Sequence, residues 1–98
     1  MKEVKGIFKI VQSFNITNRG IVVIGHFLEG YPLIGYFLVV DIDGQPATVK
    51  IKGIERGKVD AEGKMPWGLT LHFDDVSLEK IAETNGIKEQ VVEIFAVS

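Results

Sequence analysis

Two histidines and one acidic pair have the side-chain types that could support catalysis or metal binding. His26 and His72 lie far apart, each within an apolar segment, and lack the short spacing of metal ligands. Asp74 and Asp75 are adjacent, and neighbouring strand residues point to opposite faces, so their position before a helical stretch favours capping. No serine or threonine has an identifiable base partner, and no glycine-rich phosphate loop is present. We therefore expect no enzyme, no catalytic or metal-binding residue, no cofactor and no nucleotide.

The basic side chains gather in one stretch, Lys50, Lys52, Arg56 and Lys58, although the net charge is −2. A patch that faces phosphates is one interpretation of this stretch. The other is a solvated strand face whose lysines prevent edge pairing. The acidic balance argues against strong non-specific binding of nucleic acid.

The composition is that of one globular domain, with 98 residues, 46% hydrophobic and 24% charged side chains, and no cysteine. No apolar run reaches the length of a membrane span, and Lys9 interrupts the first apolar stretch. We expect a single domain over residues 1–98, cytoplasmic, without a disulfide and without a membrane partner.

Alternation with a period of two dominates the chain and indicates an all-β fold. Phe8, Ile10, Phe14 and Ile16 are expected to share one side of the first strand. Continuous apolar character in "IVVIGHFL" indicates a strand covered on both faces. The strands are expected near residues 6–16, 21–28, 36–42, 47–57, 67–73 and 88–97.

Glycines mark the expected turns and one bulge. The segment from Asn18 to Gly20 predicts a turn, and Asp43-Gly44 predicts a hairpin. Ile54 breaks the alternation just after Gly53, and an extra residue there would return Ile54 to the core, so we expect a β-bulge at Gly53.

One short helix is predicted near residues 77–84 in "SLEKIAETNG". Ser77 is expected to cap its start and Asn85-Gly86 to end it. Together with the strands, this predicts a small closed barrel of six or seven strands, which removes the exposed edges of an open sheet.

The stretch "SFNITNRGIVVIGHFLEGYPLIGYFLVV" resembles the second domain of translational GTPases, the β-barrel of elongation factor Tu and its relatives. That family has a Phe-x-Ile-x-Gly-Arg-Gly-Thr-Val-Val-Thr-Gly-Arg pattern followed by spaced glycines. The segments "VKIKGIER" and "WGLTLHFDDVSLEKIAETNG" extend the resemblance over nearly the whole chain. The matching residues are Phe14, Ile16, Arg19, Gly20, Val22, Val23, Gly25, Gly30 and Gly35.

The departures from the family concern its tRNA site. In the tRNA-carrying members an acidic pair and an asparagine hold the aminoacyl end, and the corresponding positions here are Val11, Gln12 and Pro66. Only Glu55 matches. Val11 and Pro66 offer no side-chain polar group, so we do not expect this chain to carry aminoacyl-tRNA. We expect no GTPase domain and therefore no nucleotide switch.

A second set of departures replaces polar family positions by Ile21, Ile24, Phe37 and Val39. Alternation places Phe37 and Val39 outside the barrel, and Ile21 and Val23 are expected as their outer neighbours. Such a patch is typical of a contact surface. The alternative is that the helix or the first strand covers it. The candidate protein interface is Ile21, Val23, Ile24, Phe37 and Val39.

Two functions from different classes follow from these patterns. The first is a stand-alone, non-enzymatic binding module that acts through protein contacts, including association with a second copy. The alternative is an accessory that binds RNA or the ribosome, as the family resemblance implies. Its candidate contact residues are Arg19, Lys50, Lys52, Glu55, Arg56 and Lys58.

Overall fold

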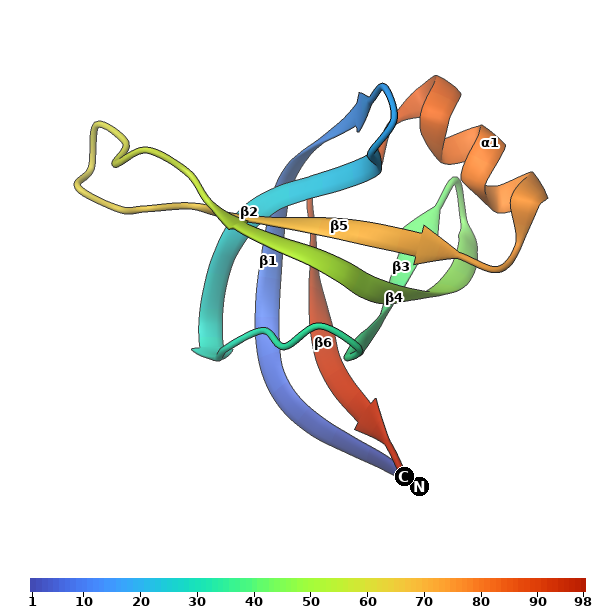
Figure 1. Cartoon of the computed structure of the whole chain (residues 1–98), viewed down its shortest axis with the longest axis horizontal. Coiled ribbons are helices and arrows are strands. Elements are labelled where there is room, and N and C mark those ends of the chain that lie inside the picture. The colour runs from blue at the N-terminus through green and yellow to red at the C-terminus, as the bar shows by residue number, and fades with distance from the viewer.

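Six antiparallel strands close into one barrel, and a single helix lies across one end (Figure 1). The computed structural model describes all residues 1–98. The strands follow one another around the barrel in the order β1-β2-β5-β4-β3-β6, and β6 returns to β1. The predicted all-β closed barrel with one short helix is confirmed. The elements are β1 (Lys2–Ile16), β2 (Gly20–Gly30), β3 (Phe37–Ile42), β4 (Gln45–Arg56), β5 (Trp67–Phe73), α1 (Val76–Asn85) and β6 (Gln90–Val97).

The core consists of alternate side chains from all six strands, as the period of two predicts. Each strand presents its inward residues to the same interior. Residues with no exposed surface include Phe8, Ile10, Val23, Leu38, Val40, Ile51, Leu69, Leu71 and Ile94.

Both predicted turns are confirmed by their backbone angles. Asn18 (φ 67°) and Gly20 (φ 95°) adopt the left-handed region between β1 and β2. Asp43 (φ 49°) and Gly44 (φ 89°) do so between β3 and β4. In the two-residue β3–β4 turn, positive φ at both Asp43 and Gly44 is typical of type I′ geometry, whose twist matches that of the strands it joins.

The bulge expected at Gly53 is present in β4. Ile51 pairs with Leu71 and Gly53 with Thr70, so Lys52 is the extra residue. After this shift Ile54 pairs with Leu69 and packs, partly buried, against the core.

A second bulge, which the sequence reading missed, changes the first strand. Ile10 pairs with Gly25 and Gln12 with Ile24, so Val11 is an extra residue in β1. The bulge reverses the alternation, and Phe14 is 50% exposed instead of sharing the buried side with Phe8. The expected single side for the four apolar residues of this strand is therefore wrong beyond Ile10.

The helix begins and ends at local signals. Asp75 is the N-cap, because its Oδ1 accepts a hydrogen bond from the Leu78 backbone N–H at 3.1 Å. The expected cap by Ser77 is wrong by two positions, and one of the two aspartates takes that role. Gly86 ends the helix with φ 76°, and its N–H donates to the Ala82 carbonyl at 2.8 Å.

The helix closes the barrel at the end where β3 and β6 separate. Its Leu78 and Ala82 join the core there, as does Ile87. Between the separated strands the Gln90 side chain takes the place of a backbone partner. Its Oε1 accepts from the Asp41 N–H at 2.8 Å, and its Nε2 donates to the Asp41 carbonyl at 3.2 Å. No helix of the protein combines the length and the apolar character needed to cross a lipid bilayer.

Candidate functional site

The outward side chains of β3 are those that alternation predicts. Leu38 and Val40 point inward and have no exposed surface. Phe37 and Val39 lie on the outer side, where Phe37 is half-buried and Val39 is 39% exposed. This part of the predicted interface therefore lies at the surface of the barrel.

The expected partners of these residues on β2 are wrong. Ile21 is 2% exposed and Val23 has no exposed surface, because both point into the barrel. In addition, β5 and β4 lie between β2 and β3, so the two strands are not neighbours. Ile24 is half-buried on the outer side of β2 and does not adjoin Phe37.

The neighbour of Phe37 comes instead from the last strand. Phe37 pairs with Phe95 of β6, and their rings stack with centroids 5.9 Å apart and planes at 25°. Val4 of β1 pairs with Phe95 on its other side. Val4 and Val97 are 50% and 60% exposed. We name this surface the Phe37 face, and it consists of Phe37, Val39, Phe95, Val4 and Val97.

Two lysines border the aromatic pair. Lys50 of β4 is the cross-strand partner of Phe37, and its Nζ lies 5.6 Å from the centroid of the Phe37 ring. Lys2 Nζ lies 4.6 Å from the centroid of Phe95 and 3.3 Å from a Glu93 carboxylate oxygen. Lys50 has no carboxylate within 4 Å. The strand pairing thus joins part of the predicted basic stretch to the predicted apolar patch.

The other candidate RNA contacts do not gather on this face. Arg19 forms an ion pair with Glu55. The Arg56 guanidinium lies 3.9 Å from the centroid of the Trp67 ring. Lys52 extends from its bulge toward Gly20, and its Nζ is 3.5 Å from the position that a Cβ of Gly20 would occupy. Lys58 is exposed in the loop between β4 and β5.

A second outer surface, across β2, β5 and β4, is covered by its own side chains. We name it the Gly68 face, and it consists of Val22, Ile24, Thr70, Gly53 and Gly68. Val22 and Thr70 point outward yet are 3% and 6% exposed. The glycines make room for this cover: Ile24 Cδ1 lies 3.3 Å from the position of a Gly68 Cβ, and Thr70 Oγ1 lies 3.1 Å from that of Gly53.

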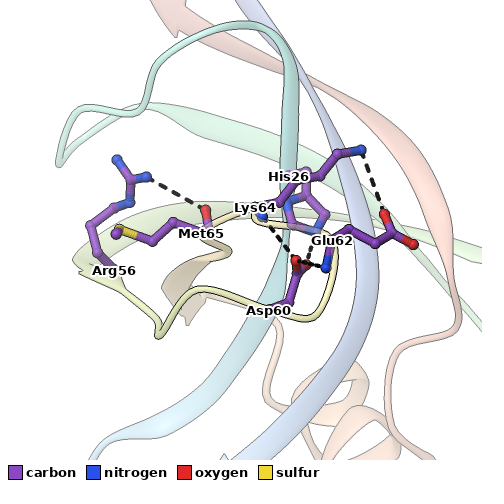
Figure 2. A network of polar contacts seen from close by, with 6 residues as sticks. All are labelled: His26, Arg56, Asp60, Glu62, Lys64 and Met65. Carbon is purple, nitrogen blue, oxygen red and sulfur yellow. Dashed lines mark hydrogen bonds and ion pairs between the residues drawn. The ribbon is translucent and has the colours of Figure 1, made fainter.

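The molecule also has one cleft, with a volume of about 500 Å³, between the β4–β5 loop and the outer side of β1 and β2. Asp60 organises the loop, because its Oδ1 accepts hydrogen bonds from the backbone N–H groups of Glu62 and Lys64, both at 2.9 Å (Figure 2). Its Oδ2 lies 4.0 Å from His26 Nε2. The lining residues are Lys9, Val11, His26, Leu28, Asp60, Ala61, Glu62, Lys64 and Glu89.

Two of the three carboxylates in this cleft are paired with lysines. Lys9 lies 3.4 Å from Glu89, and Lys64 lies 4.0 Å from Glu62. No group of three His, Asp or Glu side chains is arranged to hold a metal ion. The third carboxylate, Asp60, accepts hydrogen bonds from the loop backbone, and we assign the cleft no function.

The remaining ionisable contacts are exposed and local. His72 Nε2 lies 3.1 Å from Asp74 Oδ1 at the end of β5. The pKa of Lys5 is raised above its ordinary value, chiefly because its ammonium donates a hydrogen bond to the Glu3 carboxylate at 2.8 Å. Neither contact places a nucleophile beside a base.

The fold defines a small, closed antiparallel barrel, in which the Gly68 face is covered and the Phe37 face is open. No protein family, curated protein or solved structure matches the chain. The resemblance to the second domain of translational GTPases therefore stays a prediction from the sequence.

Proposed function

We propose that the protein is a non-enzymatic binding module, of the translation-factor barrel type, that acts through protein contact at the Phe37 face. The observation that carries this proposal is the exposure of Val4, Val39 and Val97 around the packed Phe37–Phe95 pair. Aromatic side chains are enriched in protein-contact surfaces, and covering the valines around this aromatic pair removes apolar area from water.

The geometry also favours a contact that leaves the barrel unchanged. Phe37 and Phe95 are held by their strands and by stacking, so little side-chain freedom is lost when a partner binds. The partner can be a different protein or a second copy of this chain. The predicted association through the second strand is not part of this proposal, because Ile21 and Val23 are buried.

The test is affinity capture of the tagged chain from a lysate of its source cells, with and without nuclease. Three proteins are compared: the native chain, Val39→Asp, and Val76→Asp. Val76 is an exposed valine on α1, away from the Phe37 face, and serves as the matched control. We expect nuclease-resistant capture of protein, or of untagged copies of the chain, by the native chain and Val76→Asp, and its loss in Val39→Asp. Capture that Val39→Asp leaves unchanged would contradict the proposal.

Binding of RNA is the second candidate function, and one observation favours it. Lys50, Lys52 and Lys58 have no carboxylate within 4 Å. Phosphate contacts by these lysines would make binding fall steeply with salt. Capture of RNA or ribosomal particles that nuclease abolishes, and that Lys52→Glu weakens, would select this function over the first.

A further inference from the structure

The Phe37 face has opposite charges at its two ends. At the end near Phe37 lie Lys50, beside the ring, and Lys2, above Phe95. Further along the same outer side of β3, past Val39, lies Asp41, which is exposed. The face therefore runs from a basic end, through Val39, to an acidic end.

The charges at both ends are available to a partner. Lys50 has no carboxylate within 4 Å. The Asp41 carboxylate forms no ion pair, and its one hydrogen bond, from the Gly44 N–H, is 3.4 Å long. Glu93 also lies on this outer side, but it is already paired with Lys2.

We infer that the occupant of the Phe37 face is a second copy of this chain, packed face to face with β3 antiparallel to its counterpart. This inference rests on the proposed function, since it names the partner of the same surface. A two-fold axis that lies in the interface, perpendicular to β3, and crosses that strand at Val39 places the basic end of each copy opposite the acidic end of the other. Lys50 then approaches Asp41 of the second copy, and Asp41 approaches the second copy's Lys50, while the two Val39 side chains meet at the axis. Such an interface is isologous, with each contact made twice.

A single-stranded nucleic acid fits the face less well. Bases bind by stacking on open aromatic rings. Here Phe37 is stacked against Phe95 and has Lys50 beside its ring, and Phe95 is 6% exposed. The surface left open is aliphatic, which suits another protein surface of the same kind.

The size of the face sets the strength of the expected association. Four neighbouring strands and the five residues from Phe37 to Asp41 span about 14 by 14 Å at the usual strand spacing and rise. Stable complexes bury about 800 Å² on each partner, so this contact is expected to be weak, reversible and dependent on concentration.

The experiment is sedimentation velocity over a concentration series, with four samples: the native chain, Lys50→Asp, Asp41→Lys, and an equimolar mixture of the two variants. Circular dichroism first confirms that each variant is folded. Lys80→Asp, which removes an exposed lysine of α1 outside the face, is the charge-matched control.

We expect the native chain and Lys80→Asp to dimerise alike. Each face variant alone would weaken dimerisation by about tenfold, because like charges then meet twice across the interface. The mixture would restore dimerisation, because in the mixed pair both contacts again join a lysine to an aspartate.

Two results of the sedimentation experiment would overturn the inference. One is a native chain that stays monomeric at every concentration, and the other is a mixture that associates no better than its two components. Neither outcome removes the proposed function, because capture of a different protein that depends on Val39 would still support it. If Val39→Asp changed neither self-association nor capture, both proposals would fail. Binding of a single-stranded oligoribonucleotide that Lys50→Asp abolishes would also overturn the inference, in favour of nucleic acid.

Discussion

The Gly68 face and the Phe37 face of the barrel differ in how far their outward apolar side chains are exposed. On the Gly68 face, the outward Val22 is only 3% exposed, because two glycines let neighbouring side chains lie over the sheet. On the Phe37 face, the outward Val39 is 39% exposed, and Val4 and Val97 are more so. The Gly68 face covers its own apolar side chains. The Phe37 face leaves apolar area exposed to water, where another molecule can bind.

The ion pairs do not divide in the same way, because Lys2 on the Phe37 face is paired with Glu93, and Lys52 on the side of the Gly68 face has no carboxylate within 4 Å. Arg19 and Glu55 pair with each other near the Gly68 face, and Lys52 extends toward Gly20 on that side. On the Phe37 face Lys50 has no carboxylate partner. The comparison of the two faces shows that a hydrophobic residue at an outward position does not by itself identify a contact surface. Whether its side chain is exposed depends on the neighbouring side chains.

The largest expected effect is a difference in stability between matched valine-to-aspartate variants of the two faces. Val22→Asp places a charge at a site where the side chain is almost fully covered, and we expect it to lower the free energy of unfolding by about 3 kcal/mol. Val39→Asp, the same change on the open face, should lower it by only about 1 kcal/mol, mainly through lost strand propensity. Urea denaturation of both variants measures the difference. Equal losses in the two variants would mean that the two faces do not differ in cover.

A smaller effect tests the role of the glycine. In Gly68→Val the new side chain meets Ile24 and Val22, whose nearest atoms lie 3.3 and 3.5 Å from the Cβ position. We expect a loss of about 1 to 2 kcal/mol, net of the gain in strand propensity. Thr48→Val, at an exposed position opposite Val39, is the control and should change stability by less than about 0.5 kcal/mol. If Gly68→Val left the free energy of unfolding unchanged, the burial of side chains on the Gly68 face would not depend on the absence of a side chain at Gly68.

The smallest effect concerns the ion pair of the covered side. Arg19 and Glu55 are each about half exposed, so their pairing contributes little. Arg19→Ala should lower stability by about 0.5 kcal/mol at low salt and by less at high salt. Thermal unfolding at two salt concentrations measures this. A loss of stability that salt leaves unchanged would point to packing by the Arg19 stem instead.

Local signals predicted most of the fold. Asp43-Gly44 specifies a hairpin because both residues accept positive φ, and the broken alternation at Ile54 located the bulge at Gly53. The bulge at Val11 left a similar signal, because the polar Gln12 interrupts the apolar series between Ile10 and Phe14. The prediction nevertheless kept Phe14 on the side of Ile10, and the reversal is seen only in the pairing with β2.

The candidate surface was predicted only in part. Phe37 and Val39 alternate with apolar residues that suit a core, and once Leu38 and Val40 are assigned to the interior their outward position follows. Ile21 and Val23 could not be placed, because four consecutive apolar residues give both faces of β2 the same character. Phe95 was missed because its contact with Phe37 depends on the closure of β6 onto β3, a pairing between segments far apart in the chain.

The most direct test of the account is the concentration dependence of the backbone amide chemical shifts of the native protein. We expect shifts that move with concentration at Phe37, Val39, Lys50 and Phe95, while those of Val22, Gly53, Gly68 and Thr70 stay constant. Shifts that do not move at any concentration, or that move on the Gly68 face, would contradict the claim that the Phe37 face binds a second copy of the chain.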